Sequence, residues 1–189
     1  MGVSIGAALA EARRQAGLTV AQVSQRTRIR QTIIRGIEGD DCSVCDGDFY
    51  ARAAAAGPGG GDNPQLAYRA IDASHASAWR TDWYTTARFG NLSPGTGLLL
   101  GMGHPVTVTG AAISLGSARG AALQIRVGPA RGLAQLQPVA GAAGAAGVLR
   151  LRFSRSAHGR YVLLWFTRLP ADPGGAFQAS VYNIKLTGG

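Results

Sequence analysis

Five side chains between positions 80 and 88 could together recognise a sugar. Trp83 and Tyr84 offer flat aromatic faces, which can stack on the apolar face of a pyranose ring. Arg80, Asp82 and Arg88 offer planar polar groups that can meet the ring hydroxyls. Their closeness in the sequence places these groups in one loop. We therefore expect these five residues to form a ligand-binding loop.

Residues suited to catalysis or metal binding are few. His75, His104 and His158 are far apart, and no Ser/His/Asp or Cys/His set can be assembled around them. Cys42 and Cys45 form one C-x-x-C without a second pair, so a tetrahedral zinc site would lack two ligands. No glycine-rich stretch has the context of a nucleotide-binding loop. We expect no catalytic residues, no cofactor and no enzymatic activity.

Length and charge allow one ordinary domain or two small ones. The chain has 189 residues, of which 46% are hydrophobic and 15% charged, and this excludes disorder as the whole answer. Of the net charge of +9, most lies beyond residue 52, where twelve basic residues face four acids. A basic surface attracts nucleic acid, anionic lipid or an anionic polymer, but it does not select among them.

No segment reads as a membrane span or a signal peptide. The longest uncharged run, 89–118, is interrupted by Pro94, Pro105 and several glycines. The arginine pair at 13–14 is not followed by an apolar stretch of the kind a leader needs. We expect a soluble, cytoplasmic protein.

The first 52 residues predict a small helical domain. Helical spacing of apolar residues favours a helix over 4–16, ended by Gly17. Thr19 caps a second helix, and a third begins near Arg30 after a short turn, so the pair forms a helix-turn-helix. If this motif binds DNA, the contacting residues are expected to be Arg28, Arg30, Gln31, Thr32 and Arg35.

Charge weighs against DNA binding by this domain. Residues 1–52 carry seven arginines against six acids, and five of the acids lie between 38 and 48. Affinity for DNA rests on neutralising phosphates, which a nearly neutral domain does poorly. A protein is therefore an alternative to DNA as the binding partner of this domain.

The rest of the chain predicts a linker and a β-sandwich. Residues 53–64 run from alanines into Gly, Pro and Asn, which favours a flexible spacer. From residue 65 to 189, short alternating apolar runs recur between turns, at 98–100, 106–108, 112–115, 123–127, 148–153, 161–166 and 177–186. The fold class is thus α+β and multidomain: an all-α helix-turn-helix bundle followed by an antiparallel β-sandwich of jelly-roll type. Trp165, inside one of these runs, is expected in the core.

The N-terminal part resembles the helix-turn-helix domain of bacterial RodZ-like proteins, which is of the Cro/repressor type. The resemblance is carried by residues 5–9, 12–13, 16–19, 23–24, 26–29, 37–40 and 48–52. It implies docking on an MreB-like filament through Phe49 and Tyr50. Closure of the small core would explain Phe49 equally well, whereas an exposed Tyr50 would favour the contact. Family members are single-pass membrane proteins, whereas the match here stops after Arg52, which leaves a shortened derivative as a further possibility.

The C-terminal part resembles a discoidin-like, galactose-binding-type β-sandwich of actinobacterial membrane proteins. The resemblance is carried by residues 70–72, 78–84, 95–98, 106–108 and 159–167. It implies ligand recognition, with a glycan or cell-wall polymer as the expected partner, and a core position for Trp79. It also makes Asp72 the one candidate for a loop calcium site; otherwise no metal is expected.

Two functional hypotheses follow. In the first, the protein is a non-enzymatic adaptor of the RodZ-like type, linking a cytoskeletal or cell-wall partner to a ligand in the context of cell shape. In the second, it is a DNA-binding transcriptional regulator whose sandwich senses a ligand.

Overall fold

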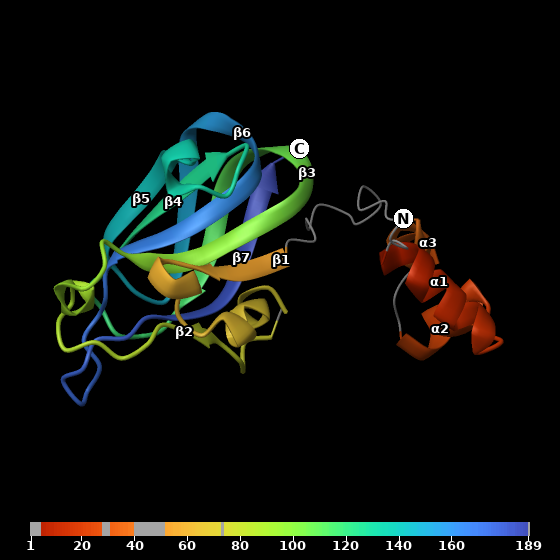
Figure 1. The fold of residues 1–189 in the computed structure, drawn as a ribbon, viewed down its shortest axis with the longest axis horizontal. Helices are drawn as coiled ribbons and strands as arrows, with labels where there is room; N and C mark the ends of the chain where they lie inside the picture. The colour runs from red at the N-terminus through yellow and green to blue at the C-terminus, as the bar shows by residue number, and fades with distance from the viewer. Residues whose placement is uncertain (1–4, 28–30, 40–51, 73, 189) are drawn as a thin grey trace. The chain divides into compact units, whose positions relative to one another are not determined.

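The chain divides into two compact units, Met1–Tyr50 and Ala51–Gly189. The computed structural model describes residues 5–27, 31–39, 52–72 and 74–188 (Figure 1). Among these residues, no helix is long and apolar enough to cross a membrane.

The first unit contains the three predicted helices, α1 (Ile5–Gln15), α2 (Val20–Thr27) and α3 (Gln31–Glu38). Gly17 adopts a left-handed φ of 66° after α1, as a residue ending a helix does. At the start of α2, the Thr19 hydroxyl accepts from the Gln22 amide at 3.2 Å, and the Gln22 side chain accepts from the Thr19 amide at 2.8 Å. This reciprocal capping box confirms Thr19 as the cap.

In the first unit, α1 packs against α3. Ala10 and Ile34 are buried, whereas Leu9 stays 48% exposed. The guanidinium of Arg13 on α1 donates to both carboxylate oxygens of Glu38 on α3, with Nη2 to Oε2 at 2.9 Å. A fork-to-fork ion pair thus supplements a small apolar core.

The second unit is an antiparallel β-sandwich, as predicted. Its strands are β1 (Arg52–Ala56), β2 (Trp79–Arg80), β3 (Thr96–Leu115), β4 (Ala121–Gly128), β5 (Gln137–Ala145), β6 (Val148–Arg168) and β7 (Ser180–Gly188). The pairing order is β2-β7-β3-β6-β4-β5, and β1 pairs with β3. Short 3₁₀ turns precede β2 at Pro58–Gly60 and Pro64–Ala70, and another, Phe89–Asn91, precedes β3.

Two long strands belong to both layers of the sandwich. The first part of β3 pairs with the end of β6, and after a register shift between Gly101 and Val106 its second part pairs with the start of β6. β1 and β4 pair only with the first of these regions, whereas β7 pairs with the second part of β3. Several runs predicted as separate strands are therefore segments of β3 and β6.

The predicted flexible spacer over 53–64 differs from the structure. Ala53–Ala56 lie in β1, with Ala54 opposite Leu99 and Ala56 opposite Gly97 of β3. Asp62, at the far end of the predicted spacer, is buried. Alanine carries no strong strand signal of its own, but its small side chain fits against a neighbouring strand. The second unit thus begins at about residue 51, before the predicted start at 65.

The core confirms the positions expected for Trp79 and Trp165, both of which are buried. Trp79 stacks on Phe166 with ring centroids 6.5 Å apart. Trp165 packs with Leu136 and Leu163 on the outer side of β6.

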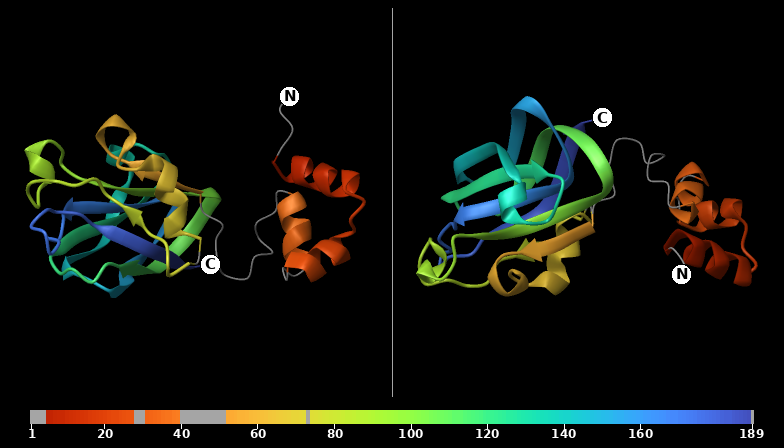
Figure 2. Two further views of the ribbon diagram at one scale, coloured as in Figure 1. Left: turned by 90° about the horizontal axis from the view of Figure 1, so that it is seen from below. Right: turned by 45° about the horizontal axis from the view of Figure 1, so that its top comes forward.

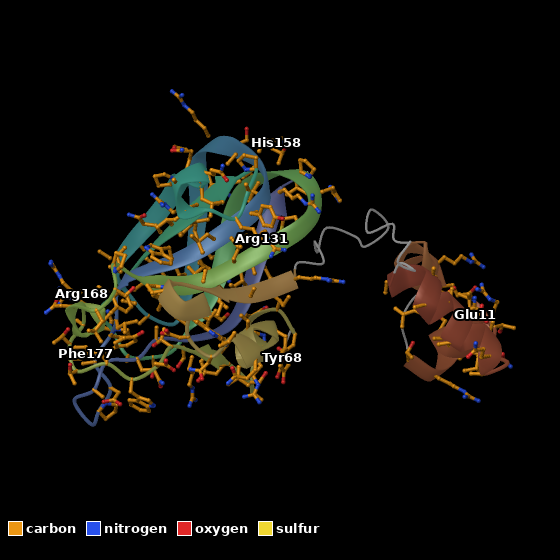
Figure 3. All side chains as sticks on the ribbon, in the orientation of Figure 1. Glu11, Tyr68, Arg131, His158, Arg168 and Phe177 are labelled. Carbon is orange, nitrogen blue, oxygen red and sulfur yellow. The ribbon has the colours of Figure 1, made fainter. Side chains whose placement is uncertain are left out.

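Two long loops lie together at one end of the second unit. The β2–β3 loop and the β6–β7 loop meet there in every view (Figures 1 and 2). Figure 3 places Arg168 and Phe177 at this end and His158 away from it. We refer to it below as the loop end.

Candidate ligand-binding site

The β2–β3 loop is fastened to the β6–β7 loop by backbone hydrogen bonds. The Tyr84 amide donates to the Phe177 carbonyl at 3.0 Å, and the Phe177 amide donates back to Tyr84 at 2.9 Å. Further along, the Leu169 amide donates to the Ala87 carbonyl at 2.9 Å. The two loops therefore hold each other in place at the loop end.

Asp62 holds the β2–β3 loop through its side chain and β2 through its main chain. Its carboxylate accepts from the Tyr84 hydroxyl at 3.0 and 3.1 Å and from the Asp82 amide at 3.1 Å. Its carbonyl accepts from the Trp79 indole at 2.9 Å. Burial raises the pKa of Asp62 above its ordinary value. Burial, reinforced by the neighbouring Asp62 carboxylate, also raises the pKa of Tyr84.

The turn that follows is strained. Phe89, Gly90 and Asn91 have consecutive left-handed φ angles of 56°, 62° and 60°, a conformation costly for a side chain as large as Phe. The Phe89 ring is buried and meets the Tyr84 ring edge-on at 5.4 Å. Packing of Phe89 thus holds the turn in a shape its sequence would not adopt alone.

This turn and the end of β6 line an open surface cavity of about 670 Å³. Its walls come from the turn, from the start of β4 and from the last residues of β6: Arg88, Phe89, Asn91, Leu92, Ser93, Pro94, Ala122, Thr167 and Arg168. Arg88 and Arg168 are exposed, and Leu92 is 84% exposed. Two guanidinium groups, the Asn91 amide and the Thr167 hydroxyl can therefore converge on a ligand in this cavity.

The structure separates the five residues predicted for the binding loop. Arg88 lines the 670 Å³ cavity, whereas Arg80 lines a smaller one of about 220 Å³ together with Asp172, Gln178 and Tyr182. The Asp82 carboxylate accepts from the Asn63 side chain at 2.9 Å. The Tyr84 hydroxyl is bound to Asp62 and so holds the loop, and stacking of its ring on a sugar stays a prediction.

Trp83 lies beside these residues and is 63% exposed, and it lines neither cavity. Its indole remains available to a ligand that extends beyond the cavity walls. A stacking role for Trp83 stays a prediction.

Sequence reasoning missed Arg168 and Asp62. Arg168 lies two residues after the apolar run 161–166, and a polar residue at the end of a buried strand was a usable signal. Asp62 carried no local signal, because its partners Trp79, Asp82 and Tyr84 reach it only after folding.

Asp72, the candidate calcium ligand, has partners within its own turn. Its carboxylate accepts from the Ser74 amide and from the Ser77 hydroxyl, both at 2.8 Å. Among the residues that the structure describes, no group of three His, Cys, Asp or Glu side chains could hold a metal ion. Cys42 and Cys45 lie outside the described residues.

In the first unit, part of the predicted DNA-contacting set can be placed. Gln31 and Arg35 are exposed on α3, and Arg35 Nη2 donates to Gln31 Oε1 at 3.4 Å. Thr32 belongs to α3, but its side chain is outside the description. Also outside the described residues are Arg28, Arg30, Phe49 and Tyr50.

Comparison with known sequences identifies a helix-turn-helix domain in the N-terminal part of the chain. A family model described as a helix-turn-helix domain matches residues 8–56. Among curated proteins no sequence matches.

Solved structures resemble the second unit. A chitosan-binding module from a chitosanase/glucanase of Paenibacillus sp. IK-5 shares 18% identity at a TM-score of 0.55, over 75% of this chain and 97% of that one. The CBM32 module of AlyQ, in complex with 4,5-unsaturated mannuronic acid, shares 16% identity at a TM-score of 0.51, over 70% and 92%. A CBM32 module from Clostridium perfringens, in complex with GalNAc-β-1,3-galactose, shares 15% identity at 0.50, over 72% and 94%. These similarities establish a shared fold.

Proposed function

We propose that this protein is a non-enzymatic, two-module binding protein whose second unit recognises a carbohydrate at the loop end. The observation that carries the proposal is the 670 Å³ cavity between Arg88 and Arg168. Its volume is in the range of small-ligand sites, and its walls combine apolar surface with a few converging polar groups.

The cavity chemistry suits a sugar. Arg88, Arg168 and Asn91 provide planar donors for ring hydroxyls, and the exposed Leu92 provides an apolar contact for the ring face. The similar modules described above bind chitosan or hold bound sugars, which supports a carbohydrate as the ligand class here.

Binding without catalysis fits the lining. Among the described residues that border the cavity there is no carboxylate, imidazole or thiol to act as acid, base or nucleophile. Ser93 is already engaged, since its hydroxyl donates to the Gly95 carbonyl at 2.6 Å.

A glycan array probed with the full-length protein tests this proposal, followed by calorimetry on the best ligand. Arg88→Ala should weaken binding by about tenfold or more, because a hydrogen bond to a charged group is lost. Arg155→Ala, which alters an exposed residue of β6 away from the cavity, is the matched control. Equal loss in both variants, or no glycan bound, would overturn the proposal.

For the first unit we propose a protein partner in cytoskeletal or cell-wall machinery, in the manner of RodZ-like adaptors. The helix-turn-helix match over 8–56 and the near-neutral charge of residues 1–52 support this. Co-sedimentation with MreB-like filaments tests it. Substitution of Phe49 and Tyr50 by alanine should abolish co-sedimentation while leaving the helical circular dichroism unchanged; filaments that never retain the protein would refute the adaptor role.

A DNA-binding regulator is the second candidate, and the exposed pair Gln31 and Arg35 on α3 favours it. Both side chain types read base edges in the major groove. A mobility shift on genomic fragments with nonspecific competitor decides the matter. A competitor-resistant band that Arg35→Ala abolishes would establish the regulator, and absence of any such band would exclude it.

A further inference from the structure

We propose that the sugar recognised at the loop end is acidic, carrying a carboxylate or phosphate group that Arg88 and Arg168 bind together. This inference rests on the proposed carbohydrate-binding function and narrows its ligand class. It comes from the presence of Arg168 beside Arg88 on one cavity, which the predicted binding loop did not include.

The fold brings two like charges to one cavity. Arg88 and Arg168 are 80 positions apart in the sequence, yet both line the same walls. The backbone hydrogen bond from Leu169 to Ala87, at 2.9 Å, joins the residues next to them. Because this bond is made by the main chain, the two arginine segments are held side by side without any ligand.

Neither arginine has a carboxylate partner within the described structure. Both ion pairs found there, Arg13–Glu38 and Arg14–Glu11, belong to the first unit. The second unit has four acids for its twelve basic residues beyond position 52. Those acids are Asp62, Asp72, Asp82 and Asp172, and each accepts hydrogen bonds elsewhere, from Tyr84, Ser77, Asn63 and the Ala176 amide respectively.

An anion is the ligand that this arrangement favours. Guanidinium groups present a planar fork of donors that matches the oxygens of carboxylate or phosphate, and such charge-assisted bonds are stronger than bonds to neutral hydroxyls. A second guanidinium on the same cavity strengthens the attraction further. The two positive charges repel each other in the free protein, and a bound anion relieves this repulsion. For the same reason a cationic amino sugar is disfavoured here.

The remaining polar groups can hold the neutral part of the sugar. Asn91 and Thr167 border the same cavity as the two arginines and the apolar side chains of Leu92 and Pro94. Acid recognition by the arginines and hydroxyl recognition by these neutral groups would together give specificity for a sugar acid over a simple anion.

The test measures matched pairs of oligosaccharides on the full-length protein by calorimetry. Each pair shares a backbone and differs only in charge: oligogalacturonate with its methyl ester, and oligoglucuronate and oligomannuronate with theirs. Sugar phosphates paired with their neutral sugars distinguish phosphate from carboxylate as the source of the anion. The acidic member of at least one pair should bind about tenfold more tightly than its neutral partner, and the preference should shrink as salt is raised.

Variants locate the effect. Arg88→Gln and Arg168→Gln should each remove most of the preference for the acidic member while keeping weak binding of the neutral one, and Arg155→Gln should keep the preference intact. Inorganic phosphate and acetate alone should bind far more weakly than the sugar acids. Equal affinity for acidic and neutral members would overturn the inference but leave carbohydrate binding standing, whereas failure of every sugar to bind would overturn the proposed function itself.

Discussion

The hydroxyl of Tyr84 donates to both carboxylate oxygens of Asp62, at 3.0 and 3.1 Å, across 22 positions of sequence. This contact ties the start of the second unit to the loop that carries Arg88. Tyr84 was a candidate for sugar stacking, but its role in the structure is to hold the binding loop. Positioning and recognition are thus divided between neighbouring residues of one segment.

Tyr84→Phe should reduce the free energy of unfolding by about 1–3 kcal/mol, because the buried Asp62 carboxylate loses a donor. Urea denaturation measures the change. Trp83→Phe alters the exposed neighbour and should stay within about 0.5 kcal/mol of the wild type. Equal effects of the two substitutions would show that the Tyr84 contact does not stabilise the loop.

Asp62 should make stability fall as pH rises. Burial raises the pKa of Asp62 in the folded state above its unfolded value, so the folded protein holds the proton more tightly. Its contribution is therefore lost as pH rises from the ordinary aspartate range through the raised pKa. The asparagine of the Asp62→Asn variant does not titrate. As pH rises across this window, the unfolding free energy of the variant should therefore increase relative to that of the wild type. Parallel pH profiles would contradict the buried, proton-binding state of Asp62.

Gly95 should not tolerate a side chain. A Cβ at this position would clash with the backbone carbonyl oxygen of Phe166 and would lie 2.6 Å from the Trp165 indole nitrogen, closer than real Cβ contacts. Gly95→Ala should therefore cost about 1–3 kcal/mol by overpacking, measured by urea denaturation. Gly132→Ala is the control, since φ there is −67° and the nearest atom is 3.6 Å away. A neutral Gly95→Ala would contradict this packing, because both the Phe166 backbone and the Trp165 indole would have to shift at no cost.

The Arg13–Glu38 pair should stabilise the first unit above acidic pH. The hydrogen bonds from Arg13 lower the pKa of Glu38, so the pair contributes fully above the ordinary glutamate range and is lost as pH falls through the lowered value. Glu38→Gln should lower the melting temperature of the helical signal at neutral pH and converge with the wild type in acid. Glu11→Gln, which breaks only the exposed pair with Arg14, should change little.

Local signals predicted much of this fold. The cap at Thr19 and the glycine at 17 placed the helix boundaries, because capping depends on residues only a few positions apart. Alternating apolar runs predicted the sandwich for the same reason. Strands β1 and β5 were not predicted, because their alanines and glycines do not alternate with polar residues. They are strands because they pair with β3 and β4, which the sequence pattern does not show.

The site was predictable only in part. Arg88 was predicted from its place in a polar, aromatic segment. Arg168 lies at the end of β6, far away in the sequence, and it comes close to Arg88 only through folding, as the backbone hydrogen bond from Leu169 to Ala87 shows. Conversely, Tyr84 and Asp82 looked like ligand contacts because sequence cannot show that the Tyr84 hydroxyl donates to Asp62 and that the Asp82 carboxylate accepts from Asn63.

The most direct test of the central claim maps the bound sugar on the protein. Isotope-labelled full-length protein is titrated with the tightest glycan from the array, and amide chemical shifts are followed. The account predicts saturable shifts concentrated around the 670 Å³ cavity, at Arg88, Asn91, Thr167 and Arg168. Shifts centred instead on the smaller cavity at Arg80 and Tyr182, or saturable binding that leaves Arg88 and Arg168 unperturbed, would contradict it.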